Sequence, residues 1–66
     1  MHRGYETKEL IEKTALHLFV KQGITETTIR HIASAADIAE GTMYRHFSGK
    51  EELAWDIFSK NFLAVN

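Results

Sequence analysis

The sequence predicts a small all-α domain, because apolar residues recur at helical spacing along most of the chain. Glycine or capping residues stand where one helical pattern ends and the next begins. A chain of 66 residues makes one domain at most and has room for three or four helices around an economical core. We therefore expect residues 1–66 to form a single helical domain.

The first helix is expected over residues 7–22. Four apolar residues follow the spacing of an amphipathic helix: Ile11, Ala15, Leu18 and Phe19. Thr7 can cap the start of this helix, and Gly23 supplies its stop. The preceding residues, 1–5, are polar and charged and are expected to form a loose arm.

Two shorter helices joined by a tight turn are expected next. Thr27 and Thr28 can cap a helix over residues 28–35. Asp37 interrupts it, since aspartate is one of the few residue types besides glycine that tolerate a left-handed turn conformation. The third helix is expected over residues 39–46. Three apolar side chains around it should be buried: Ile38, Met43 and Phe47.

A last helix is expected to begin next to Lys50. Ser48 can accept a hydrogen bond from the amide of Glu51, whose carboxylate can reach back, as in a capping box. The helix has more apolar residues than one buried stripe requires: Leu53, Ala54, Trp55, Ile57, Phe58, Phe62, Leu63 and Val65. We therefore expect one face of this helix to contact a partner outside the chain. Trp55, Phe58 and Phe62 are expected to belong to the core or to a domain interface rather than to a platform for stacking bases.

Composition excludes several classes of protein. The chain has no cysteine, so disulfide frameworks and thiolate zinc sites are ruled out. It shows neither a signal peptide nor an apolar run of about 18 residues, and we expect a soluble, cytoplasmic protein without membrane contacts. We find no nucleophile beside a base, no glycine-rich phosphate loop and no zinc-ligand cluster, so neither enzyme activity nor a cofactor is expected. His31 and His46 lack partners at metal-ligand spacing and are expected to be surface histidines.

The formal net charge of −1 weighs against nucleic-acid binding, because such domains are often strongly basic. The distribution of charge is more informative. Six acidic residues fall in two flanking segments: Glu6, Glu9, Glu12, Glu51, Glu52 and Asp56. Arg30, Arg45 and Lys50 are spread through the middle, with few acidic residues nearby. The middle of the chain is therefore not acidic, although it is no strong electrostatic funnel either.

The two short helices predict a helix-turn-helix, since small Ala33 and Ala36 allow close approach. Three apolar side chains are expected to fix the angle between the helices: Ile32, Ile38 and Met43. In this motif the second helix enters the major groove of DNA. With Met43 buried, six residues remain on or near its outer face: Glu40, Gly41, Thr42, Tyr44, Arg45 and His46.

Lys50 is unusual because a cation in the first turn of a helix opposes the helix dipole, at a cost of roughly 0.3–1 kcal/mol. A DNA phosphate beyond that end of the helix would remove the conflict. The simpler alternative is a solvated lysine whose cost is outweighed by the capping box. Next to a helix-turn-helix, we favour the phosphate contact.

The segment TTIRHIASAADIAEGTMYRHFSGKEEL resembles the DNA-binding segment of the TetR (tetracycline repressor-like) family of bacterial transcriptional regulators. The resemblance extends upstream through Ile11, Ala15, Phe19 and Gly23 and covers nearly the whole chain. It implies a three-helix, homeodomain-like bundle with a helix-turn-helix, followed by the start of a fourth, linking helix. It also implies a sequence-specific repressor that binds a palindromic operator in double-stranded DNA. The homodimer contacts and the small-molecule effector site would lie in a C-terminal domain absent from this sequence.

The resemblance also implies roles for individual residues. Four are implied to contact DNA phosphates: Thr27, Thr28, Tyr44 and Lys50. Six are implied to read base edges: Arg30, Glu40, Gly41, Thr42, Arg45 and His46. The chain departs from the family at Asp37, where glycine is usual, and at Ala39, where serine or threonine is usual. The missing side-chain cap at Ala39 is expected to weaken the third helix by about 1 kcal/mol.

Several assignments stay open at this point. Arg45 can contact a base or a phosphate, and the Tyr44 ring can pack in the protein while its hydroxyl meets a phosphate. Phosphates would repel Glu40 unless its carboxylate accepts a hydrogen bond from cytosine N4. Alternatively, Glu40 disfavours binding to the wrong DNA sequences. A different class of function also fits: a small helical protein-interaction module that uses the apolar last helix.

Overall fold

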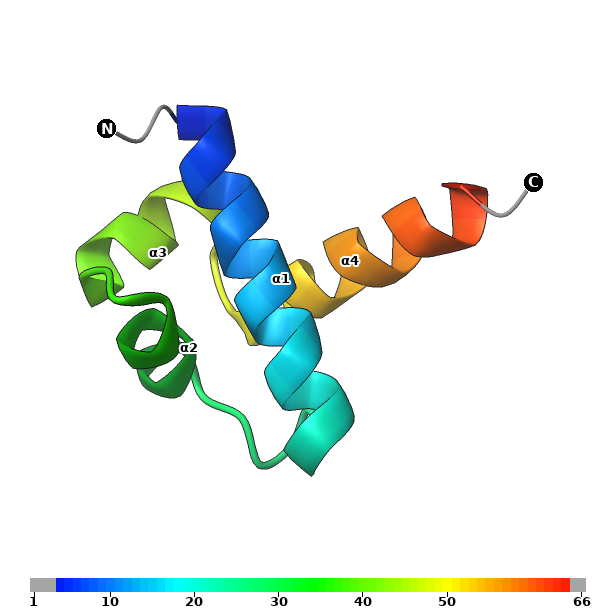
Figure 1. Ribbon diagram of the computed structural model, residues 1–66, viewed down its shortest axis with the longest axis horizontal. Helices are drawn as coiled ribbons and strands as arrows, with labels where there is room; N and C mark the ends of the chain where they lie inside the picture. The colour runs from blue at the N-terminus through cyan, green and yellow to red at the C-terminus, as the bar shows by residue number, and fades with distance from the viewer. Residues whose placement is uncertain (1–3, 65–66) are drawn as a thin grey trace.

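The structure is a computed structural model that describes the backbone of residues 4–64 and the side chains of residues 7–60. The described backbone forms four helices and no strand: α1 (Gly4–Gln22), α2 (Ile29–Ala36), α3 (Glu40–His46) and α4 (Lys50–Ala64). Helix α1 packs against α2 and α4, and α2 packs against α3. Figure 1 shows α2 and α3 on one side of α1, while α4 leads away on the other side. The predicted all-α fold is confirmed.

The helix boundaries agree with the predicted ones to within about one residue, except at the start of α1. This helix begins at Gly4, so Thr7 lies inside it and does not cap its start as predicted. The physical reason is that no proline and no β-branched residue stands at positions 4–6 to interrupt the helix. The predicted loose arm is therefore helical over part of its length.

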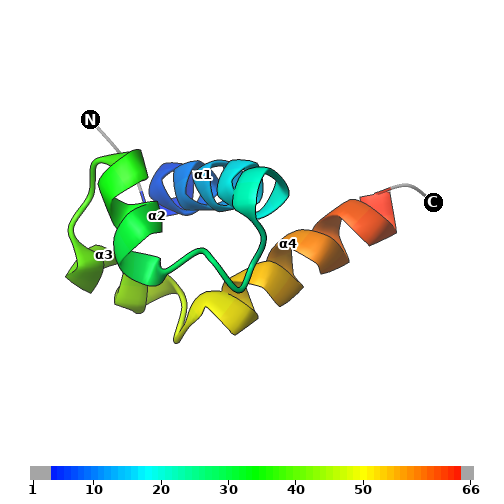
Figure 2. The same cartoon turned by 90° about the horizontal axis from the view of Figure 1, so that it is seen from below.

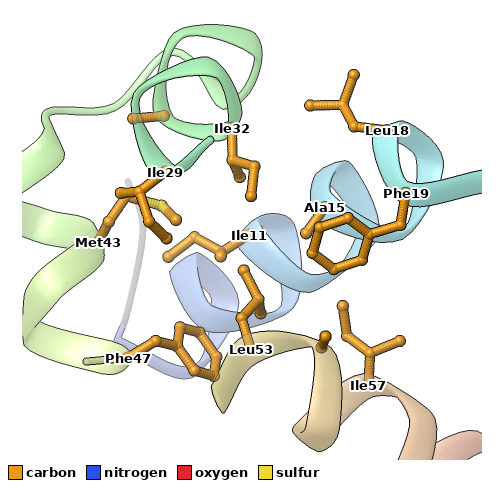
Figure 3. Close-up of a cluster of buried hydrophobic side chains, with 12 residues drawn as sticks. Ile11, Ala15, Leu18, Phe19, Ile29, Ile32, Met43, Phe47, Leu53 and Ile57 are labelled. Atoms are coloured by element: carbon orange, nitrogen blue, oxygen red, sulfur yellow. The ribbon is translucent and has the colours of Figure 1, made fainter. Parts of the chain in front are cut away.

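One core joins all four helices. The largest side chains with essentially no exposed surface are Ile11, Thr27, Ile32, Met43 and Leu53. Figure 3 shows Ile11 of α1 between Ile29 and Ile32 of α2, Met43 of α3 and Leu53 of α4. Full burial of an aliphatic side chain of this size contributes about 1.5–3 kcal/mol. The core thus fixes the position of the short helices α2 and α3, which could not persist alone.

The turn between α2 and α3 is closed by backbone hydrogen bonds at Asp37. Asp37 has the left-handed conformation predicted for it, with φ 60° and ψ 46°. Its amide donates to Ser34 O at 3.1 Å, and the amide of Ile38 donates to Ala33 O at 2.9 Å. This pair of bonds satisfies carbonyls that the end of α2 would otherwise leave free. The first turn of α3 has no side-chain hydrogen bond at its N-cap, Ala39, as predicted.

The start of α4 differs from the predicted capping box by one residue. The helix begins at Lys50, and the carbonyl of Gly49 accepts from Leu53 N at 3.2 Å. The residue that reaches back is therefore Glu52 rather than Glu51. Its Oε1 accepts from both Ser48 N and Ser48 Oγ, the latter at 2.9 Å. These two bonds, the backbone one first, lower the pKa of Glu52.

Helix α4 has the predicted surplus of apolar surface. Leu53, Ala54 and Ile57 are buried, whereas Trp55 is 74% and Phe58 47% exposed. The side chains of Phe62, Leu63 and Val65, which belong to the same prediction, lie outside the described residues. Among the described residues, no helix combines the length and the apolar character needed to cross a membrane.

Candidate nucleic-acid interface

Helix α3 presents one apolar and one polar side. Met43 is completely buried between α2 and the rest of the core, which fixes the rotation of α3 about its axis. Gly41, Tyr44 and Arg45 consequently face solvent. Thr42 and His46 lie at the edges of this face and are half-buried. All the predicted outer-face positions of α3 thus retain some exposed surface.

Arg30 and Glu40 connect the two helices of the motif. Arg30 Nε, in the first turn of α2, lies 3.5 Å from Glu40 Oε1, in the first turn of α3. The Arg30 side chain is 85% and the Glu40 side chain 45% exposed, so water screens the ion pair and it adds little to stability. Its effect is to hold two predicted base-reading groups side by side and to offset the negative charge of Glu40.

Gly41 leaves open space at the surface of α3. A Cβ atom built at this position would meet no atom within 4 Å. Gly41 also lies inside the helix, where alanine is favoured by about 0.8–1 kcal/mol. The free protein therefore gives no packing reason for glycine here, which is consistent with close approach of a ligand to the backbone.

The two threonines before α2 have different environments. Thr28 is exposed and caps α2, with its Oγ1 accepting from His31 N at 3.0 Å. Its hydroxyl hydrogen remains available to a phosphate oxygen. Thr27 has no exposed surface, and its hydroxyl donates to Gly23 O at 2.7 Å. The predicted phosphate contact of Thr27 thus has no support from its placement, because its side chain is turned into the protein.

Lys50 also has an environment that the sequence did not predict. Its Nζ donates to three backbone carbonyls, those of Ile24 at 2.8 Å, Thr25 at 3.2 Å and Thr27 at 2.9 Å. The cation in the first turn of α4 therefore has acceptors within the protein. These contacts join residues 23 to 26 positions apart, so no local sequence pattern predicts them. The only sequence feature that pointed to them was the apparent conflict between Lys50 and the helix dipole.

A second charged group lies between α1 and α4, away from α3. Lys60 Nζ is 2.8 Å from Oε1 of Glu12, which is buried, and Asp56 lies beside them. Burial, followed by the hydrogen bond that a protonated Glu12 can donate to the adjacent Asp56, raises the pKa of Glu12. The same interaction lowers the pKa of Asp56. Sequence analysis placed Glu12 and Asp56 only among flanking acidic residues and did not detect this cluster.

Other chemistry finds no support in the described part of the chain. No group of three or more histidine, cysteine, aspartate or glutamate side chains could hold a metal ion there. His31 is exposed, and its Nδ1 lies 3.1 Å from Gln22 Nε2. His46 packs beside Phe47, with ring centroids 6.4 Å apart.

Two short helices crossing at a closed turn, with the second buried on one side and polar on the other, define a helix-turn-helix module. The comparison with known proteins specifies the family. The sequence profile described as bacterial regulatory proteins, tetR family, matches residues 11–57. The chain belongs to this family.

Curated relatives agree with this assignment. Over 48 residues, the chain is 50% identical to YerO of Bacillus subtilis, an uncharacterised helix-turn-helix transcriptional regulator; the match covers 73% of this chain and 17% of YerO. It is 37% identical to the transcriptional regulator AcrR of Shigella flexneri over 59 residues, or 85% of this chain and 27% of AcrR. It is 42% identical to the transcriptional repressor KstR2 of Mycobacterium tuberculosis over 55 residues, or 83% of this chain and 26% of KstR2. The chain thus spans about a quarter or less of each relative. No solved structure matches it significantly.

Proposed function

We propose that this chain is the DNA-binding domain of a transcriptional regulator and that α3 lies in the major groove of its operator. The observation that carries the proposal is the exposed polar face of α3, with Gly41, Tyr44 and Arg45, on a helix whose opposite face is anchored by Met43. A major groove about 12 Å wide admits one α-helix. Membership of a family of regulatory proteins supports the same function.

Base reading is assigned to the outer face of α3 and to the start of α2. Arg45 has the donors for a bidentate contact with guanine, and the Thr42 hydroxyl and methyl groups suit either a base edge or a thymine methyl. His46 lies at the edge of the same face. Arg30 and Glu40, joined at 3.5 Å, act as one unit in which the guanidinium reduces the repulsion between Glu40 and phosphates.

Phosphate contacts are assigned to Thr28 and Tyr44. The Thr28 hydroxyl has a free hydrogen beside the first amides of α2, which themselves favour an anion. Tyr44 is 54% exposed, so its hydroxyl is accessible from solvent. Thr27 is left out because its hydroxyl is used in the α1–α2 turn.

The whole regulator is proposed to be a cytoplasmic homodimeric repressor on a palindromic operator, with dimer contacts and effector site in sequence beyond this domain. Three observations support this proposal: the short share of each relative that the chain spans, the name of the repressor KstR2 and the exposed Trp55 and Phe58 on α4. A single module reads one half-site, and dimers gain affinity by pairing two copies across a two-fold site. The alternative, a protein-interaction module, accounts for the exposed face of α4 but not for that of α3.

Gly41→Ala tests the proposed orientation of α3. The substitution adds a methyl group where the free protein has open space, so the fold should be retained and α3 slightly stabilised. If the α3 backbone approaches DNA at Gly41, the methyl group should weaken binding to duplexes in a titration at low salt. Ala35→Gly makes the opposite exchange at an exposed position of α2 and shows how much helix propensity alone changes the affinity. Unchanged affinity of Gly41→Ala would contradict close approach of the α3 backbone to DNA at this residue.

A further inference from the structure

The side chain of Lys50 joins two segments that are distant in sequence. Figure 2 shows the loop between α1 and α2 descending to the first turn of α4. At this junction the Lys50 ammonium donates to the carbonyls of Ile24, Thr25 and Thr27 at 2.8, 3.2 and 2.9 Å. An ammonium group has three N–H donors, and each has an acceptor here. A phosphate could bind Lys50 only in competition with these carbonyls.

The loop that Lys50 contacts leads directly into α2. Thr27 is fully buried, and its amide donates to Ile24 O at 3.1 Å. Gln22 Nε2 donates to Thr27 Oγ1 at 3.3 Å and to Glu26 O at 3.2 Å, which adds a second link from the end of α1. The next residue, Thr28, is the N-cap of α2. The three carbonyls bound by Lys50 therefore belong to the segment that sets where α2 begins.

We propose that Lys50 is a positioning residue for DNA recognition: its ammonium ties the first turn of α4 to the α1–α2 loop and thereby places the Thr28 cap and α2. Because α3 packs on α2, the same contact sets the position of the recognition helix. The inference rests on the proposed function for its effect on DNA binding, but the contact itself is a property of the free protein. It differs from a direct phosphate contact, in which Lys50 would act on DNA and leave the loop unchanged.

Two substitutions separate these roles. Lys50→Met removes the ammonium and retains a long flexible side chain. Lys50→Arg retains the charge, but a planar guanidinium cannot direct three donors to three carbonyls that surround one nitrogen atom. A positioning role predicts that both variants lose affinity for DNA, whereas a phosphate contact predicts that arginine replaces lysine. Lys13→Met, at an exposed position of α1, is the matched control for loss of one positive charge.

The first measurement is binding to a labelled duplex of random sequence over a range of salt concentrations. For Lys50→Met we expect a loss of at least about tenfold, typical of losing a charged hydrogen bond. The slope of log K against log salt should match the wild type, since no phosphate contact is lost. Lys50→Arg should show a loss in the same direction. A slope smaller by roughly one, together with wild-type affinity for Lys50→Arg, would overturn the proposal in favour of direct phosphate contact.

The second measurement is amide hydrogen exchange in the free protein. Three amides report on the segment: Thr27, bonded to Ile24 O, and His31 and Ile32, bonded to the side chain and carbonyl of Thr28. They should exchange faster in Lys50→Met and Lys50→Arg than in wild type and Lys13→Met. Unchanged exchange would overturn the positioning role whatever happens to DNA binding. If the wild-type chain does not bind DNA at all, the proposed function fails, while the exchange experiment still decides whether Lys50 holds the loop.

Discussion

Arg30 Nε and Glu40 Oε1 lie 3.5 Å apart, which pairs the first turn of α2 with the first turn of α3 across the helix-turn-helix. The pair brings together two residues that the family resemblance implies to read bases. It also explains how a carboxylate can be accommodated on a surface proposed to face phosphates. Since both side chains are open to solvent, the ion pair affects the charge of this surface more than the stability of the fold.

Glu40→Gln is therefore expected to raise affinity for all duplexes, because it removes a negative charge and releases Arg30. An increase of about two- to tenfold at low salt follows from one charge at surface distances. The free energy of unfolding should change by less than about 0.5 kcal/mol. Glu9→Gln, which removes one negative charge from an exposed position of α1, is the control. Affinity that falls only for duplexes with cytosine at one position would instead show that Glu40 accepts from a base.

Glu51 and Glu52 offer a matched pair for the capping of α4. Both are exposed acidic residues in its first turn, but only Glu52 accepts hydrogen bonds from Ser48. We expect Glu52→Ala to lower the midpoint of thermal unfolding more than Glu51→Ala at neutral pH.

The pH dependence of this difference follows from the lowered pKa of Glu52. A carboxylate whose pKa is lower in the folded state contributes stability above its unfolded pKa and loses it as pH falls through the folded pKa. The two variants should therefore converge in acid. Equal midpoints at neutral pH would show that Ser48 and Glu52 do not cap α4 in solution.

Ala39→Ser should stabilise the domain, because α3 starts at a residue with no side-chain cap. Serine at this position is expected to add about 0.5–2 kcal/mol to the free energy of unfolding in urea. Ala35→Ser provides the control at an exposed position within α2, where serine costs a few tenths of a kcal/mol. A loss of stability in Ala39→Ser would indicate that α3 begins elsewhere.

Glu12 should make stability depend on pH. Its pKa is raised by burial and by the hydrogen bond with Asp56, so the folded state binds this proton more tightly than the unfolded state. The free energy of unfolding should consequently fall as pH rises above the ordinary glutamate value of 4.5 and through the raised pKa. Glu12→Gln, which keeps a donor for Asp56 without titrating, should remove that fall.

The opposite shift of Asp56 acts at lower pH and does not cancel this effect. The lowered pKa of Asp56 contributes stability above its unfolded value, which is lost as pH falls. Urea unfolding of wild type, Glu12→Gln and the exposed control Glu9→Gln across this range measures both effects. Parallel curves for wild type and Glu12→Gln above pH 4.5 would contradict the assignment.

Features of the fold that depend on local sequence were predictable. Apolar spacing identified the helices, and Asp37 was identified because turn preferences act within a few residues. The missing cap at Ala39 was predicted from the family resemblance, since serine or threonine is usual there. The prediction of Glu51 as the capping partner was wrong, because the helix begins after Gly49, one residue later than predicted. The roles of Lys50 and Glu12 depend on segments brought together by folding. The spacing of apolar residues along the sequence gives no information about such contacts.

The candidate DNA surface was predictable to a similar degree. Burial of Met43 sets which side of α3 is exposed, and a helical period suffices to derive that. Thr27 and Thr28 are adjacent in sequence and equally suited to capping, so only their packing separates the buried one from the exposed one. The base that each side chain reads is a property of the complex and not of the free chain.

Selection of bound duplexes from a random pool, with the wild type, Thr42→Ala and Arg45→Ala, tests the central claim most directly. Fusion of each chain to an unrelated dimeric domain raises affinity for paired sites and makes the selection practical. If α3 reads the major groove, the wild type should select a two-fold symmetric sequence. Each substitution should then relax preference at particular base pairs, by about 1–3 kcal/mol for a bidentate contact. Wild-type selection without sequence preference, or uniform weakening by both substitutions, would contradict base recognition by α3.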